Sequence, residues 1–454
     1  LPSKRASRAA GVAVLALASL LLGGTTGAGA ATPPRVTVDG AAVGPFSALV
    51  RFTVDQPARV VIEYGTGPDT QVWTKQVTVG AGVGAELRLT ALEPATSYRF
   101  RVLASSGTAR GVAEGSVVTP RMPTSVRGRT IRDALVVNGQ RFFPRMVWQQ
   151  CPYAYATSIA AGINTFMGTG CVTPQAQLGA LGGRALSIID VAKRAVGGPG
   201  LVGWHHLDEA DEHVGSPAGI PRVPSSRETG RVSFLTLTNH FYSGASPLPH
   251  GREMYPGLID RTEMVGFNLY PLQVWCRKNR FHDVYEAQRE LVTLAAGRPT
   301  FQWIEAGPMN QCFGLDPSPA IVRAETWLAI AGGARGIGFF PDQWRPDVRA
   351  EVRRLSTEIA SLSAALLAPA GEATVTSPSP IRVGVRRWRD ATYVIAVNPT
   401  FARVGATITV PGLGTAGLRV YGDGRWVTAR DDSFSDRFRG LEARIYVAPP
   451  PGTT

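Results

Sequence analysis

Two short apolar runs in the middle of the chain each end in carboxylate side chains. Residues 201–207 are followed by Asp208 and Glu209, and residues 301–304 are followed by Glu305. Two carboxyl groups about 5 to 5.5 Å apart can cleave a glycosidic bond, because one protonates the leaving oxygen while the other attacks the anomeric carbon. We therefore take Glu209 and Glu305 as the candidate catalytic pair, provided that the fold brings them together.

Other interpretations of these carboxylates stay open. A lone carboxylate at a strand end is also commonly a solvated loop residue or a helix cap, and Asp211 and Glu212 follow Glu209 closely enough to shift the register. His205, His206 and Asp208 further suggest metal-dependent hydrolysis, although no H-E-x-x-H pattern accompanies them. We expect no metal ion.

The middle segment, 131–367, alternates strand-like and helix-like stretches, which is typical of an eight-stranded α/β (TIM) barrel. The strands are expected at 142–148, 164–167, 185–189, 201–207, 232–238, 264–269, 300–304 and 336–340. Strands four and seven lie on opposite sides of the narrow mouth of such a barrel, so Glu209 and Glu305 could face each other there. A doubly wound sheet is the alternative, but no glycine-rich phosphate turn follows the first strand.

Glutamates that close the fourth and seventh strands resemble those of clan A, a large group of retaining glycoside hydrolases. The resemblance implies that Glu209 is the acid/base and that Glu305 is the nucleophile. It also implies sugar-binding or supporting roles for four side chains at other strand ends: Asn239, His240, Tyr270 and Trp344. We add Trp148, His206 and Asp208 as candidate substrate-binding residues, because they too lie at strand ends. Asp208 departs from the family pattern, in which an Asn at this position binds the sugar 2-hydroxyl.

Aromatic side chains at the strand ends have two interpretations. Trp148, Trp204, Trp275 and Trp303 could pack the barrel or line a sugar site. Their residue type alone does not separate these two roles.

The four cysteines follow strands of the predicted barrel. Cys151 and Cys171 follow strands one and two, and Cys276 and Cys312 follow strands six and seven. Loops of neighbouring strands lie close together, so we expect the disulfides 151–171 and 276–312 at the rim of the site. None of the cysteines has the spacing of a zinc site.

The first 31 residues resemble a secretory signal peptide. They combine the basic residues Lys4, Arg5 and Arg8 with a short apolar stretch at 11–22 and a cleavage site near Ala30. The sequence therefore predicts secretion into an oxidising compartment. An uncleaved membrane anchor is the alternative.

Two β-rich segments flank the barrel. Segment 33–120 has short alternating runs, and its stretch 92–102, which contains Tyr98, resembles the corner and following strand of a fibronectin type III domain. That resemblance implies a β-sandwich spacer or adhesion module able to contact a cell wall or extracellular matrix. Residues 121–130 are expected to be a linker, and 371–450 a small C-terminal β-sandwich.

Composition narrows the function classes further. Of the 454 residues, 44% are hydrophobic and 18% are charged, which excludes a disordered chain or a coiled coil. The net charge is +13, yet the basic residues are spread along the chain without a basic block, so no nucleic-acid partner is expected. We predict a secreted retaining glycoside hydrolase that acts on a polysaccharide or glycan without a cofactor. The alternative is a non-catalytic carbohydrate- or wall-binding protein on a barrel scaffold.

Overall fold

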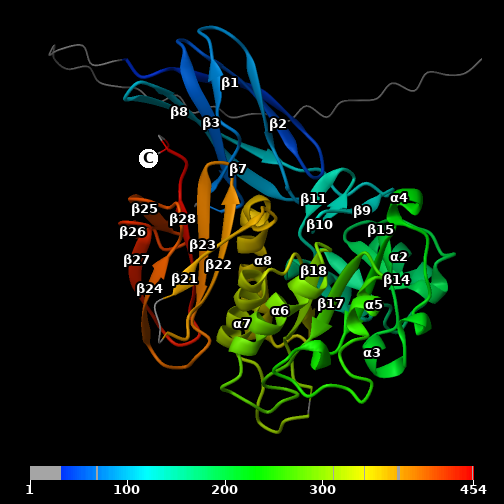
Figure 1. Ribbon diagram of the computed structural model, residues 1–454. Coiled ribbons are helices and arrows are strands. Elements are labelled where there is room, and N and C mark those ends of the chain that lie inside the picture. The colour runs from blue at the N-terminus through cyan, green and yellow to red at the C-terminus, as the bar shows by residue number, and fades with distance from the viewer. Residues whose placement is uncertain are drawn as a thin grey trace, which may run out of the picture.

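The computed structural model describes residues 32–451 and 453, except 68, 69, 310, 342 and 376–378 (Figure 1). The signal peptide predicted over 1–31 lies outside the described residues. No helix in the described part of the chain is long and apolar enough to cross a membrane.

The central part of the chain is a closed barrel of eight parallel strands. Its strands run in sequence order: β12 (Arg145–Trp148), β13 (Thr165–Met167), β14 (Leu186–Asp190), β15 (Leu201–His205), β16 (Val232–Leu237), β17 (Met264–Asn268), β18 (Thr300–Glu305) and β19 (Ile337–Phe340). The last strand pairs with the first, with Arg145 opposite Ile337. This closure confirms the predicted barrel and excludes the doubly wound sheet.

Helices cover the outside of the barrel. They are α1 (Pro152–Ala160), α2 (Pro174–Leu181), α3 (Ala210–His213), α4 (Ser226–Thr229), α5 (Tyr255–Ile259), α6 (His282–Leu294), α7 (Pro319–Gly332) and α8 (Pro346–Leu366). Pro at the first turn of α7 suits a helix start, and the side chain of Ser318 caps the backbone N–H of Ile321. The segment between β15 and β16 contains the short helices α3 and α4 and a 3-10 helix at Pro217–Gly219, so it is mainly loop.

A small antiparallel sheet closes the bottom of the barrel. It comprises β9 (Gly128–Ile131), β10 (Ala134–Val137) and β11 (Gln140–Phe142). The backbone N–H of Gly128 donates to the carbonyl of Gly230 at 2.8 Å, and Leu135 packs against barrel residues such as Val202. The end of the expected linker, 128–130, is therefore a strand. This strand was not expected from the sequence, because the strands of this sheet are only three or four residues long.

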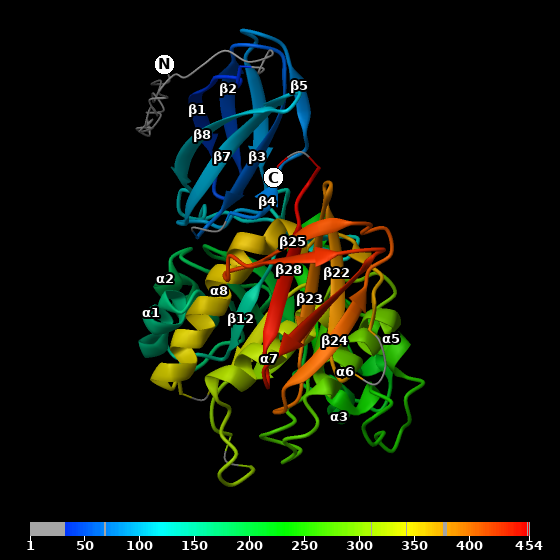
Figure 2. The same ribbon diagram turned by 90° about the vertical axis from the view of Figure 1, so that its left-hand side faces the viewer.

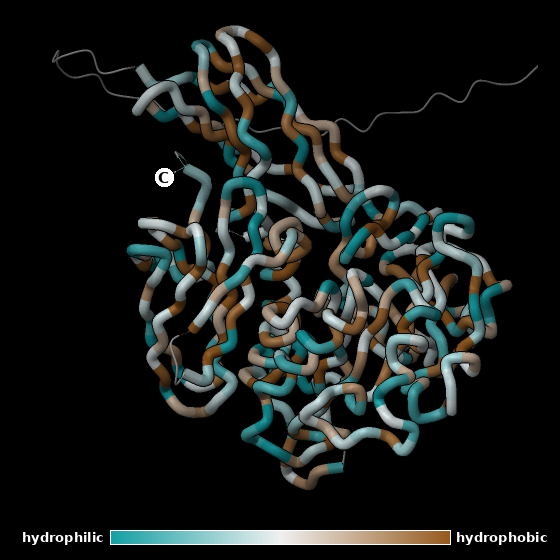
Figure 3. Tube along the Cα trace, in the orientation of Figure 1, coloured by the Kyte–Doolittle hydropathy of each residue, from teal (hydrophilic) through white to brown (hydrophobic). Residues whose placement is uncertain are grey.

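The N-terminal segment forms two antiparallel sheets around an apolar core. One contains β1 (Val36–Val43), β2 (Ala48–Val54) and β6 (Ala85–Leu89), and the other contains β3 (Ala58–Gly65), β4 (Val72–Trp73), β5 (Val77–Val79), β7 (Ser97–Ser106) and β8 (Ala109–Val118). Hydrophobic and hydrophilic residues alternate along these strands (Figure 3). The hydroxyl of Tyr98 accepts a hydrogen bond from the N–H of Glu93 at 2.9 Å, as the predicted corner requires. Membership of the fibronectin type III family stays a prediction.

The C-terminal segment also forms two antiparallel sheets. The larger has the strand order β20 (Ala370–Gly371), β22 (Arg382–Trp388), β23 (Ala391–Val397), β28 (Ala443–Ala448), β25 (Ala416–Val420) and β26 (Trp426–Ala429). The smaller comprises β21 (Thr374–Val375), β24 (Val404–Thr409) and β27 (Ser433–Phe438). Strands β20, β21, β26 and β27 were not expected from the sequence.

The N-terminal sheets are docked on the rest of the chain. Figure 2 shows them above α8 and the C-terminal sheets. The indole N–H of Trp388 donates to the carbonyl of Trp73 at 2.9 Å, and the hydroxyl of Tyr393 donates to the carbonyl of Gln71 at 2.6 Å. A buried ion pair between Arg145 on β12 and Glu93 joins the same sheets to the barrel.

Candidate active site

A pocket of about 350 Å³ lies at the C-terminal ends of the barrel strands. It contains six of the residues predicted for the site, which are Trp148, Asp208, Glu209, Asn239, His240 and Tyr270. It is also lined by Glu212, Thr238, Asn268, Val274, Trp303, Met309, Gln311 and Phe340. Segments far apart in sequence therefore meet in one cavity at the end of the barrel where catalytic residues are found.

Glu209 lies in this pocket in an unusual backbone conformation. It follows β15 directly before α3 and has φ 49° and ψ 44°, in the left-handed region that side chains other than Gly, Asn and Asp rarely adopt. Such a conformation costs on the order of 1–3 kcal/mol and is common at functional sites. The amide of Asn268, at the end of β17, donates a hydrogen bond to Oε1 of Glu209. This contact fixes the Glu209 carboxylate at the pocket wall.

Asp208 is a second carboxyl group in the pocket. Burial, followed by the charge of Glu209, raises the pKa of Asp208 to about 7. Two neighbouring carboxyl groups in a half-buried site do not both ionise readily. Asp208 therefore carries a proton for part of the time near neutral pH, beside the carboxylate of Glu209.

Glu305 ends β18 but is not among the described residues that line the pocket. Its side chain is fully buried. The backbone N–H groups of Leu272 and Gln273 donate to its two oxygens at 3.0 and 2.7 Å. Burial raises the pKa of Glu305, and the neighbouring Glu325 and the hydrogen bonds from these two amides oppose that rise. Glu305 thus lies behind the wall of the pocket, held by the loop that follows β17.

The side chain of Glu325 on α7 is buried beside Glu305. Burial, followed by the charge of Glu305, raises the pKa of Glu325 well above its usual value. Of these two carboxyl groups, Glu325 is the one that retains a proton at neutral pH, and Glu305 is the one that its neighbours favour as a carboxylate.

The hydroxyl of Tyr270 is affected by the charges of the pocket carboxylates and of the buried Glu305. Burial raises the pKa of its hydroxyl well above the usual value, followed by the charges of Asp208, Glu209 and Glu305. Its ring lies nearly parallel to that of Phe340, with the ring centroids 6.3 Å apart. Tyr270 therefore lies within electrostatic range of both candidate catalytic glutamates.

Aromatic rings form much of the remaining wall. Trp148 meets Trp303 edge to face, with the centroids 5.7 Å apart, and it meets the ring of His205 at 5.2 Å. The indole N–H of Trp303 donates to Oγ1 of Thr236 at 3.3 Å. Apolar ring faces beside a few carboxyl and amide groups suit a ligand with both apolar faces and polar edges, such as a sugar.

Besides Glu305, two residues predicted for the site lie outside the pocket lining. The indole N–H of Trp344 donates to Oγ of Ser158 on α1 at 3.0 Å, and Trp344 is not among the described pocket residues. Phe340, at the end of β19, lines the pocket instead. His206 is buried outside the lining, and burial, followed by His205, lowers the pKa of His206 to about 4.

The carboxylates that follow Glu209 have separate positions. Asp211 is fully buried and accepts hydrogen bonds from the backbone and side chain of Thr238 and from the hydroxyl of Tyr255. It therefore supports the loop after β15. Glu212 lines the pocket, where its Oε1 is 3.6 Å from Nε2 of His240.

Two disulfides brace the rim of the mouth, as predicted. Cys151–Cys171 joins the loops after β12 and β13, with a Cα–Cα distance of 5.2 Å. Cys276–Cys312 joins the loops after β17 and β18, with a Cα–Cα distance of 5.4 Å. Within those two loops the N–H of Met309 also donates to the side chain of Gln273. The backbone that holds Glu305 is therefore cross-linked.

The structure offers no obvious metal site in the part of the chain that it describes. No group of three or more His, Cys, Asp or Glu residues among the described positions could hold a metal ion. Nδ1 of His205 lies 2.8 Å from the carbonyl oxygen of His206, so one nitrogen of this candidate ligand already has a protein partner.

Several pocket residues were not expected from the sequence. Asn268, Thr238 and Phe340 were not singled out, Glu212 was considered only as an alternative to Glu209, and Trp303 was left between two roles. The sequence contains a signal for Trp303 and for Asn268. Trp303 follows Phe301 at the spacing that points both side chains to the barrel interior, and Asn268 ends an apolar strand, as Glu305 does.

The barrel is similar to several solved structures at low sequence identity. An endoxylanase of family GH30 from Clostridium papyrosolvens C71 is 10% identical, with a TM-score of 0.42, over 72% of this chain and 98% of that chain. A putative alpha-galactosidase from Bacteroides fragilis is 8% identical, with a TM-score of 0.46, over 92% and 98%. A beta-glucuronidase from Ruminococcus gnavus is 10% identical, with a TM-score of 0.37, over 72% and 68%.

No protein-family model matches the chain, and no curated protein is similar to it at a significant level. At the identities and TM-scores above, the structural neighbours assign no activity to this chain.

Proposed function

We propose that this chain is a secreted glycoside hydrolase that cleaves an O-glycosidic bond in a polysaccharide or glycan with retention of configuration. The observation that carries the proposal is the placement of Glu209, in a strained backbone conformation, inside an aromatic-walled pocket at the mouth of a closed barrel. The two disulfides are compatible with an oxidising extracellular compartment.

In the proposed mechanism, Glu209 is the general acid/base and Asn268 orients its carboxylate. Asp208, whose pKa is about 7, can hold a proton beside Glu209. Asp208 and Glu209 then carry one negative charge between them. An edge-to-face arrangement of Trp148 and Trp303 provides apolar walls for the sugar ring. These roles need no cofactor.

Glu305 is the proposed nucleophile. Its carboxylate is stabilised by two backbone N–H groups, but attack requires the side chain to turn out of those hydrogen bonds toward the wall at Tyr270. A nucleophile must come within about 3–3.5 Å of the anomeric carbon. Glu305 therefore has to move on substrate binding for the proposed reaction to occur.

The decisive experiment compares Glu305→Ala and Glu209→Gln with the parent chain on a panel of wall polysaccharides. We expect both variants to lose release of reducing ends, and we expect an added small anion to rescue Glu305→Ala partly. Glu228→Ala, which changes an exposed carboxylate on α4, is the matched control and should keep full turnover. Unchanged turnover in Glu305→Ala would exclude it as the nucleophile.

A second candidate is a non-catalytic carbohydrate-binding protein, and the complete burial of Glu305 favours it. Both candidates predict that oligosaccharides bind the pocket and that Trp148→Ala weakens binding. Only the hydrolase releases a reducing end. Tight binding by the parent chain without any release across the panel would select the binding protein.

A further inference from the structure

The small C-terminal sheet presents one polar face to solvent. Strands β24 and β27 pair in antiparallel register, with Gly405 opposite Arg437 and Val404 opposite Phe438. Val404 and Phe438 pack against the core between the sheets, so the alternate positions point outward. Arg403 directly precedes β24, and Arg439 directly follows β27. Both residues are exposed, as are Gly405 and Arg437.

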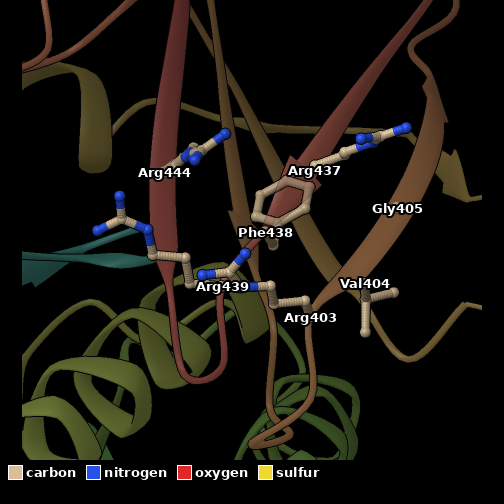
Figure 4. Close-up of a pocket in the computed structure, with 7 residues that line it drawn as sticks. All are labelled: Arg403, Val404, Gly405, Arg437, Phe438, Arg439 and Arg444. Atoms are coloured by element: carbon tan, nitrogen blue, oxygen red, sulfur yellow. The ribbon is translucent and has the colours of Figure 1, made fainter.

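The guanidinium groups of three arginines on this face have no acidic partner among the described residues. The guanidinium groups of Arg403, Arg437 and Arg439 form no ion pair or hydrogen bond with any described residue, and Figure 4 shows them around one hollow. Arg444, at the edge of the hollow, is already paired with Asp436 and Glu442. The side chains of Asp436 and Glu442 are thus paired with another arginine. The positive charges of Arg403, Arg437 and Arg439 therefore remain available to a ligand.

The hollow itself is about 450 Å³ in volume. Gly405 lies on its lining, and a Cβ added there would meet no atom within 4 Å. The absence of a side chain at this position leaves open space beside Arg437, on the same face of the ladder.

Hydroxyl groups continue the same face along the strands. Oγ1 of Thr407 lies 2.8 Å from Oγ of Ser435, and Oγ1 of Thr409 lies 2.9 Å from Oγ of Ser433. The face therefore combines a cluster of cations at one end with a row of groups that can exchange hydrogen bonds with a polyhydroxylated chain.

We propose that this face, defined by Arg403, Gly405, Arg437, Arg439 and the two hydroxyl pairs, binds an acidic polysaccharide. The guanidinium groups would bind the carboxylate or sulfate groups of the polymer, which guanidinium geometry favours. A single-stranded nucleic acid fits the hollow less well, because it needs exposed aromatic rings for its bases and Phe438, the aromatic residue among those that line the hollow, is buried. This site is separate from the barrel pocket and does not depend on hydrolysis.

Binding of the full chain to polygalacturonate, dextran sulfate and neutral dextran tests the proposal, for example by affinity electrophoresis at low and moderate salt. We expect the chain to bind one or both acidic polymers and expect dextran not to retard it. Comparing polygalacturonate with dextran sulfate distinguishes recognition of carboxylate from recognition of sulfate. The triple variant Arg403→Ala/Arg437→Ala/Arg439→Ala should lose about ten-fold in affinity. Gly405→Leu, which keeps the charge but fills the hollow, should also weaken binding.

The matched control removes the same charge elsewhere. Arg129, Arg227 and Arg353 are exposed arginines on β9, α4 and α8, and their triple replacement by Ala should leave affinity within about two-fold. An equal loss in this control would show that net charge, rather than the face, binds the polymer, and would overturn the proposal. Equal or tighter binding of oligo-dT, or binding of dextran as strong as that of the acidic polymers, would overturn it as well.

Discussion

Asp208 should make the stability of this protein depend on pH in a defined direction. Its pKa is about 7 in the folded chain, against an ordinary value of 3.8, because it is buried and lies beside Glu209. A carboxyl group whose folded pKa is raised binds its proton more tightly when folded. Its contribution to stability is complete below about pH 4 and is lost as the pH rises to about 7.

The size of this effect follows from the shift. About three pKa units correspond to about 4 kcal/mol at 1.36 kcal/mol per unit, and partial exposure of Asp208 reduces this to about 2–4 kcal/mol. Asp208→Asn cannot ionise, so it should unfold with a larger free energy than the parent chain at pH 8. Near pH 4 the two proteins should be almost equally stable.

Urea denaturation followed by tryptophan fluorescence at both pH values measures this difference. Glu209→Gln removes the second cause of the shift and should reproduce part of the gain at pH 8. Glu228→Gln, on the exposed surface, should leave the pH dependence unchanged. If the difference in free energy of unfolding between Asp208→Asn and the parent chain is the same at pH 4 and pH 8, folding does not raise the pKa of Asp208.

Two further substitutions test other buried carboxylates. Glu93→Ala leaves the guanidinium of Arg145 buried without its partner, so it should cost about 3–5 kcal/mol in urea denaturation, and a loss below 1 kcal/mol would contradict a buried ion pair. Glu325→Gln replaces the neutral acid with an amide of the same shape. At pH 7 this substitution should therefore change the free energy of unfolding by less than about 1 kcal/mol. A loss of about 3 kcal/mol or more would mean that Glu325 is ionised in the folded chain.

The sequence predicted an element well where a long apolar run, or two agreeing features of the sequence, marked it. All eight barrel strands were expected close to their observed bounds, because a strand buried on both faces reads as a continuous apolar run. Both disulfides followed from the order of those strands. The pocket positions of Asp208 and Glu209 followed from the end of the fourth strand.

The direction of individual side chains was harder to predict. Trp344 and Phe340 are four residues apart after the same strand, and only loop geometry decides which one reaches the pocket. Glu305 ends its strand as expected, but amides from a different loop bind it, and no local pattern encodes that contact. Short strands such as β9 and β20 were missed because two to four residues carry too little periodicity.

The hydrogen bonds from Trp388 and Tyr393 to carbonyls of the N-terminal sheets mean that those sheets are not a detachable module. A recombinant fragment that begins at the barrel would leave two donors facing water and would uncover the guanidinium of Arg145. Trimming the gene at this boundary, a common step in preparing multidomain proteins, would therefore alter the barrel itself.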